Sequence, residues 1–261
     1  MTRKNICWAI NMRTDTTKAA ASSHLGLVRE SNQDAVFCSP TFLFAVADGI
    51  GGLDDGKAAA NCMIRHVKSR AEKIIENCRL GSTRKVNELL RDAVSAANME
   101  LFDKAQIENK VSGTTVVIWA ICGQNLCYVW SGDSSLYFVN DNKIERLTRF
   151  HTVAQEMRNR GEDDLILPRD DHTLTRYVGI GAEPEAQPES GIFDLSRYES
   201  WALFGCTDGY DVLPQDAILD QLKQSISVEE WLRQLEKMVD AAGAPDNYSA
   251  VAVVSGSQIR L

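Results

Sequence analysis

Aspartates at the ends of apolar runs are the residues in this sequence with the clearest potential for chemistry. Five short segments share the pattern: NQD at 32–34, ADGIGG at 47–52, SGDSS at 131–135, CTDGYD at 206–211 and PDNYS at 245–249. A strand end fixes the position of a carboxylate, and an adjacent glycine leaves room for a ligand. Oxygen ligands without Cys or His suit magnesium or manganese. One Asp-Gly pair would indicate only a turn, but the repetition favours a metal site.

A phosphate-containing ligand would also need a cation from the protein. Arg29 lies five residues before Asp34, on the segment that leads to the first of these aspartates. A guanidinium binds phosphate through two parallel hydrogen bonds, which makes Arg29 the candidate. The alternative is an exposed arginine without a ligand.

The segment GGLDDGKA at 51–58 allows a different interpretation, because it contains the start of a nucleotide-binding P-loop. It follows an apolar run and precedes a helical pattern, as that motif requires. However, Ala58 stands where the motif needs Ser or Thr, and Asp54 and Asp55 would face the phosphates. Asp55 is better interpreted as a cap of the following helix. The P-loop is therefore the weaker hypothesis.

The elements that position the aspartates follow from periodicity and turn signals. We predict strands at 22–28, 34–38, 41–47, 113–122, 125–132, 135–140, 143–148, 201–206 and 249–256, and helices within 58–107 (interrupted at 80–85) and at 151–161, 214–223 and 228–242. CGQN and NDNK are hairpin turns between strands, which indicates antiparallel pairing. The pattern predicts an α+β fold, a β-sandwich covered by helices.

The domain organisation is predicted to be simple. Residues 1–20 are polar and are interpreted as an irregular lead-in, and residues 21–261 as one domain. Residues 162–190 are rich in Asp, Glu, Pro and Gly and form a long excursion, which in compact domains is usually functional or disordered.

Composition excludes several classes of protein. The 261 residues are 44% hydrophobic and 25% charged, with a net charge of −8. An acidic chain lacks the basic footprint for nucleic acid or anionic membrane. Seven cysteines show no CxxC spacing, which indicates reduced thiols rather than zinc ligands. The start of the chain has no signal-peptide pattern, so we expect a cytoplasmic protein.

In series, the motifs resemble the metal-dependent protein phosphatase family, the protein phosphatase 2C type. The resemblance covers about residues 22–255 and rests on GLVRESNQDA, FAVADGIGG, SGTT, WSGDSSLY, IERLTRFHT, LTRYVGIG, LFGCTDGYDVL and PDNYSAVAVV, in the family's order. Each motif is weak alone, whereas the series is specific. Compact bacterial members of the family resemble this sequence most, and some of them serve type VI secretion systems.

The resemblance implies a four-layer α-β-β-α sandwich with two manganese or magnesium ions, and a third, weaker one, in a cleft. It assigns Asp48 as the bridge between two metals and the Gly49 carbonyl as a ligand. Asp34 would bind through water, and Asp208 and Asp246 would complete the first metal's shell.

The resemblance also assigns the supporting residues. Asp133 would help to hold the third metal, Asn247 would support the loop, and Arg29 would bind the substrate phosphate. Residues 162–190 would be the flap subdomain. The implied activity is hydrolysis of phosphoserine and phosphothreonine by attack of a metal-bridging hydroxide on phosphorus. The implied partner is a phosphoprotein, the substrate or autophosphorylated form of a serine/threonine kinase, and the implied state is a monomer.

Some positions depart from the family pattern. Ile50 replaces a histidine that serves many members as general acid, so a metal-bound water near Asp133 would have to donate the proton. Ser135 and Phe150 replace a common arginine and aspartate, and His151 is interpreted as structural. Two alternatives stay open: an inactive member that binds phosphoproteins, and a phosphatase of small phosphate esters.

Overall fold

The computed structural model describes residues 8–11, 17–39, 42–51, 53–140, 143–181 and 187–256. Two antiparallel sheets lie face to face at the centre of the molecule. The first has the order β1 (Trp8–Asn11), β2 (Thr17–His24), β13 (Tyr248–Ser255), β12 (Trp201–Cys206), β9 (Ser135–Val139) and β10 (Ile144–Arg146). The second has the order β11 (Glu189–Asp194), β8 (Asn125–Ser131), β7 (Val116–Cys122), β4 (Leu43–Ala47) and β3 (Ala35–Cys38).

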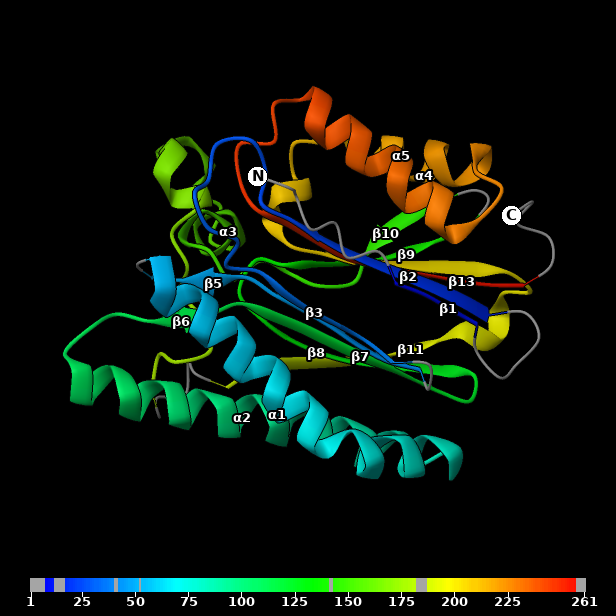
Figure 1. Cartoon of the computed structure of the whole chain (residues 1–261), viewed down its shortest axis with the longest axis horizontal. Coiled ribbons are helices and arrows are strands. Elements are labelled where there is room, and N and C mark those ends of the chain that lie inside the picture. Colours follow the sequence, from blue (N-terminus) through cyan, green and yellow to red (C-terminus); the bar gives the residue numbers. More distant parts are fainter. Residues whose placement is uncertain are drawn as a thin grey trace.

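Helices cover the outer face of each sheet and complete four layers (Figure 1). The pair α1 (Leu53–Arg79) and α2 (Thr83–Glu108) lies on the second sheet, and the pair α4 (Gln215–Gln224) and α5 (Val228–Ala241) lies on the first. The short α3 (Val153–Asn159) lies at one end of the sandwich, near the two-stranded sheet of β5 (Gly49–Ile50) and β6 (Gly113–Thr114). The predicted α+β sandwich is confirmed.

Strand β4 shows why the central strands are continuous apolar runs. Successive side chains on a strand point to opposite faces of the sheet. Leu43 and Ala45 belong to the core under α1 and α2, whereas Phe44 and Val46 belong to the core between the sheets. Because both faces are covered, the sequence cannot alternate between apolar and polar residues.

The prediction of an irregular lead-in over residues 1–20 was wrong where the structure describes that segment. Trp8–Asn11 and Thr17–His24 are strands, and residues 1–7 and 12–16 lie outside the described residues. Strand β2 pairs along its whole length with β13, from Thr17 opposite Ser255 to His24 opposite Tyr248. Pairing with the far end of the chain therefore decides the strand, although its local sequence is polar and Ala-rich.

The excursion at 162–190 is better ordered than its composition indicates. Two short 3₁₀ helices, Asp163–Leu165 and Pro168–Asp171, follow α3. The Val153 N–H donates to the Thr173 carbonyl, and Arg158 Nη2 lies 2.8 Å from Asp171 Oδ1. The segment's end is also a correction, because residues from Glu189 onward form β11, which pairs with β8. Residues 182–186 lie outside the described residues.

In the part of the chain that the structure describes, no helix has both the length and the apolar composition needed to cross a membrane.

Between the two sheets, a large aromatic side chain packs directly against a glycine. The ring of Trp119 on β7 is fully buried and lies against Gly205 on β12, where an added Cβ would be 2.2 Å from the ring.

We predict that Gly205→Ala destabilises the chain by about 1–3 kcal/mol, because the ring cannot move without disturbing the core. Urea unfolding measures the loss. In the double variant of Gly205→Ala and Trp119→Phe, the loss in free energy of unfolding should be smaller than the sum of the losses in the two single variants. Additive losses would contradict this packing.

Candidate metal centre

The register of the strands brings the five predicted aspartates to one end of the sandwich. Ala35 lies opposite Ala47, and Cys206 lies opposite both Ser135 and Ala250. Asp34 and Asp48 adjoin the first pair, and Asp133 and Asp208 lie two residues from Ser135 and Cys206. Asp246 lies two residues before β13. Segments more than 200 residues apart thus meet at one place.

The carboxyl groups lie close enough to influence one another strongly. Burial raises the pKa of Asp48 well above its usual range, and the charges of Asp34, Asp208 and Asp133 raise it further. Burial also raises the pKa of Asp34 and of Asp133 to about 7, in each case helped by the charge of Asp208. Such a cluster holds protons unless cations compensate its charge.

Two carboxylate oxygens of the cluster suit a cation in particular. Asp34 accepts a 2.9 Å hydrogen bond from Thr207 on its Oδ2, while its Oδ1 is buried and accepts none from the residues that the structure describes. Asp208 Oδ1 is likewise buried without a hydrogen-bond donor. Buried, unpaired carboxylate oxygens are costly, and a divalent cation with oxygen ligands satisfies them. The residues therefore fit the magnesium or manganese that the sequence indicates.

Asp246 differs from the other four aspartates because both of its oxygens already accept hydrogen bonds. Its Oδ2 lies 2.6 Å from Arg29 Nη2, and its Oδ1 accepts from the Asn247 N–H at 2.7 Å. As a metal ligand, Asp246 would have to share an oxygen with one of these donors. Arg29 is exposed at the rim of the cluster. Its hydrogen bond to Asp246 raises its pKa, and the charges of Asp48 and Asp208 add to this effect.

Asn247 joins the two loops that carry predicted site residues. Its side-chain Nδ2 donates to the carbonyls of Leu25 and Ser31, and its Oδ1 accepts from the Gln33 N–H at 2.9 Å. These bonds hold the loop that contains Arg29 against the start of β13. This geometry is consistent with the supporting role that the sequence predicts for Asn247.

The two Asp-Gly pairs use glycine for close backbone packing. A Cβ on Gly49 would lie 2.1 Å from the Gly56 carbonyl oxygen in α1, and one on Gly209 would lie 2.1 Å from the Asn247 carbonyl oxygen. The pairs therefore allow α1 and the loop before β13 to approach the aspartates. The role of the Gly49 carbonyl as a ligand stays a prediction.

His151 holds the loop that carries Asp133. Its backbone N–H donates to the Gly132 carbonyl, and its ring Nδ1 accepts from the Gly132 N–H at 3.1 Å. Its Nε2 lies 3.3 Å from Glu189 Oε1, and the ring stacks on Trp130. The Nδ1 acceptor requires the neutral imidazole with its proton on Nε2. The structural role predicted for His151 fits these contacts.

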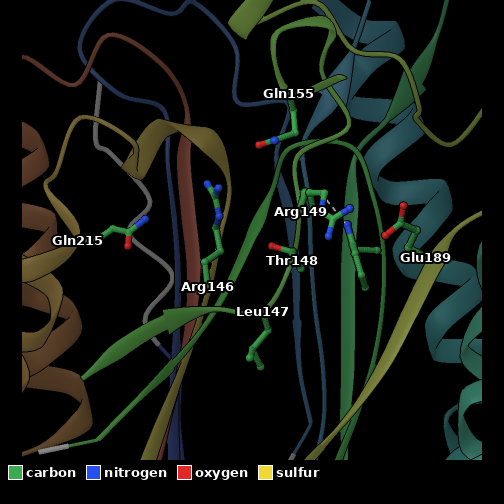
Figure 2. A pocket seen from close by; sticks show the side chains of 8 residues that line it. Arg146, Leu147, Thr148, Arg149, Gln155, Glu189 and Gln215 are labelled. Carbon is green, nitrogen blue, oxygen red and sulfur yellow. Dashed lines mark hydrogen bonds between the residues drawn. The ribbon is translucent and has the colours of Figure 1, made fainter. Parts of the chain in front are cut away.

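A pocket of about 290 Å³ adjoins the cluster. Its lining includes three carboxylates, Asp133, Asp208 and Asp211, together with Arg146 and His172. A second pocket of about 480 Å³ shares Arg146 and also has Arg149, Glu189 and Gln215 in its wall (Figure 2). Sequence reasoning did not identify Arg146 or His172. His172 carried a signal, because it is the only histidine in the 162–190 excursion, whereas Arg146 lies in an ordinary strand pattern.

The hydroxyl groups that hold the cluster were also missed. Thr207 bonds Asp34, and Thr115 Oγ1 accepts from the Asp48 N–H at 3.1 Å and pairs with Ser134 Oγ at 2.7 Å. Thr207 directly follows β12 and Thr115 directly precedes β7, and a threonine beside a strand carries no sequence signal of this function.

Comparison with known proteins agrees with this description. A family model described as Protein phosphatase 2C matches residues 18–158, more than half of the chain. Serine/threonine protein phosphatase PstP of Mycobacterium tuberculosis is 27% identical over 241 residues, which cover 89% of this chain but only 44% of PstP. The chain thus spans less than half the length of that relative. Serine/threonine phosphatase stp of Listeria welshimeri is 26% identical, with 87% of this chain and 92% of the relative covered.

Solved structures show the same fold. PppA, described as a key regulatory component of T6SS in Pseudomonas aeruginosa, superposes with a TM-score of 0.78 at 25% identity, over 94% of this chain and 99% of PppA. The catalytic domain of PstP in complex with two manganese ions gives a TM-score of 0.75 at 24% identity, over 93% of this chain and 99% of that domain. Fold and site together define the class of the metal-dependent protein phosphatases. The chain belongs to the protein phosphatase 2C family.

The contacts of His151 predict a pH dependence of stability. Burial lowers the pKa of His151 from its ordinary value of 6.5. The contribution of neutral His151 to the free energy of unfolding is therefore complete above about pH 6.5. It is lost as the pH falls through the lowered pKa, by up to about 1.4 kcal/mol per pH unit. In His151→Asn, the amide oxygen can accept the Gly132 N–H but does not titrate.

Unfolding in urea between pH 7 and 5 tests this expectation. The wild-type free energy of unfolding should fall more steeply than that of His151→Asn. His172→Asn, at an exposed position, is the matched control and should keep the wild-type slope. Equal slopes for the wild type and His151→Asn would contradict the proposed tautomer.

Proposed function

We propose that this chain is a metal-dependent phosphatase that hydrolyses phosphoserine and phosphothreonine in proteins. The observation that carries the proposal is the cluster of Asp34, Asp48, Asp133 and Asp208, with buried carboxylate oxygens that lack donors. Relatives that align over most of the chain are named serine/threonine phosphatases, which supports the choice of substrate.

The cofactors we propose are two manganese or magnesium ions, with a third at Asp133. Asp48 would bridge two of them, with the Gly49 carbonyl, Asp208 and Asp246 as further ligands and Asp34 acting through water. When bound, such ions lower the pKa of a water and offset charge on phosphoryl oxygens. The two manganese ions described for the PstP catalytic domain support this choice.

The protein's own residues then bind and orient the phosphate. Arg29 uses one N–H in its bond to Asp246 and has further donors for phosphoryl oxygens. Asn247 holds the Arg29 loop, so the position of the guanidinium is set relative to the aspartates. Thr207 and Thr115 keep Asp34 and Asp48 in place during binding.

The leaving oxygen of a serine or threonine needs a proton. We propose His172 as its donor, in place of the metal-bound water near Asp133 that the sequence led us to expect. Ile50 has no proton to donate. Of the four histidines in the sequence, His24 stacks on Tyr248, His66 bonds Glu100, and His151 is buried against Gly132. His172 is exposed and lines the pocket beside Asp208 and Asp133.

The biological setting is part of the proposal. We infer a cytoplasmic monomer that reverses the action of a serine/threonine kinase, either on the kinase's substrate or on its autophosphorylated form. The likeness to PppA supports a role beside a type VI secretion system. The segment from residue 162 to the start of β11 is proposed as the flap subdomain, and the sandwich, with β1 and β2 included, as a single catalytic domain.

Metal dependence tests the proposal directly. With manganese, the chain should hydrolyse p-nitrophenyl phosphate and a phosphothreonine peptide, and EDTA should abolish both activities. Asp208→Ala should lower kcat by roughly 10²–10³-fold, because a cation that would offset the developing negative charge loses a ligand. Asp220→Ala, at an exposed position of α4, is the matched control.

Thermal unfolding in the same samples separates the alternatives. Manganese at 100 times its Kd should stabilise the wild type by about 2.7 kcal/mol and leave Asp208→Ala unchanged. Activity that persists in EDTA would contradict the metal mechanism. Stabilisation without hydrolysis would favour an inactive phosphoprotein-binding member, and hydrolysis of small esters alone would favour a small-molecule phosphatase.

A leaving-group comparison tests His172. His172→Ala should lower kcat for a phosphothreonine peptide by roughly 10²–10⁴-fold, the usual contribution of a positioned acid. Hydrolysis of p-nitrophenyl phosphate should change far less, because nitrophenolate leaves without a proton. His66→Ala, on α1, is the control. An equal loss on both substrates would contradict the role as proton donor.

A further inference from the structure

The second pocket, of about 480 Å³, shares two wall residues, Arg146 and Gln155, with the pocket at the aspartate cluster. We call it the Arg146 groove. In Figure 2 the side-chain ends of Arg146, Gln155 and Gln215 point into the same space, although the residues come from β10, α3 and α4. A substrate bound at the cluster can therefore extend into the groove past Arg146.

Arg146 lies beside an aromatic ring rather than in an ion pair. Its guanidinium lies 3.9 Å from the centre of the Phe150 ring, a stacking contact that fixes its plane. Among the described residues it forms no ion pair, and neither does Arg149 on the opposite wall. Glu189, the acidic residue of the groove, lies near Arg176 and His151. The groove thus has two arginines without an ion pair among the described residues. Arg146 also acts on Asp211, where its charge opposes the burial that raises the pKa of that carboxyl.

We propose that the Arg146 groove binds the polypeptide beside the phosphorylated residue and that Arg146 selects an acidic side chain there. This inference rests on the proposed phosphatase function and adds a substrate class to it: phosphoproteins with Asp or Glu close to the phosphorylated residue. An extended chain advances about 3.3 Å per residue, so the selected residue lies within a few positions of the phosphate. The amides of Gln155 and Gln215 can bond the peptide main chain.

A set of phosphothreonine peptides tests the proposal with the manganese-loaded full chain. One peptide has Asp residues on the N-terminal side of phosphothreonine, one has them on the C-terminal side, and in a third Asn replaces every Asp. The wild type should hydrolyse one acidic peptide with a kcat/KM about 10-fold above that of the Asn peptide, as expected for one charge-assisted hydrogen bond. High salt should reduce this ratio.

For each variant, the kcat/KM of the acidic peptide is divided by that of the Asn peptide, so a general loss of activity cancels in the ratio. Arg146→Glu should abolish or invert the preference, and Arg146→Lys should weaken it, because an ammonium neither stacks nor bonds a carboxylate through two hydrogen bonds. Arg84→Glu makes the same charge change on the surface of α2, where its side chain is 94% exposed, and should keep the wild-type ratio.

Two outcomes overturn the inference: equal hydrolysis of acidic and neutral peptides by the wild type, or an unchanged ratio in both Arg146 variants. Arg146→Lys retains the charge and the approximate length of the side chain. If Arg146→Glu does not fold, the ratio of kcat/KM values measured for Arg146→Lys decides the test. Absence of all hydrolysis, including that of p-nitrophenyl phosphate, overturns instead the phosphatase function on which the inference rests.

Discussion

The constraint on which the structure depends is the crowding of carboxylates at one end of the sandwich. Burial and mutual repulsion raise the pKa of Asp34, Asp48, Asp133 and Asp208 together, which marks a cluster that needs compensating charge. An interior that only had to be stable would not contain such a group. The cluster is therefore the feature on which the proposed cation site rests.

The rest of the architecture holds this cluster together. Two sheets closed by helix pairs supply a rigid frame, and the register of β12, β13, β3 and β4 sets where each aspartate leaves its strand. Hydrogen bonds from Thr207 and Asn247 then join segments that are far apart in the sequence. Residues on strand ends are positioned more rigidly than residues on free loops, which suits chemistry that depends on the distances between cations.

Many strands and the candidate site could be predicted from the sequence, because local patterns of apolar residues indicate which segments are buried. The apolar runs of β4, β7, β12 and β13 identified the central strands, and the aspartates beside them indicated the candidate site. Strand β2 was only partly predicted, because its short polar and alanine-rich sequence becomes a strand only through pairing with β13. Strand β11 was hidden for a similar reason, since its place beside β8 is set by a distant partner.

The sequence by itself determined the chemical character of the site: which carboxylates are present, that they follow buried strands, and that Cys and His are not among them. Only the tertiary structure decided how these groups are engaged. It pairs Arg29 with Asp246, leaves Asp34 Oδ1 and Asp208 Oδ1 without donors, and places Arg146 between two pockets. The physical reason is that residue type sets what a side chain can bond, whereas strand register and helix packing set which partners come within bonding distance.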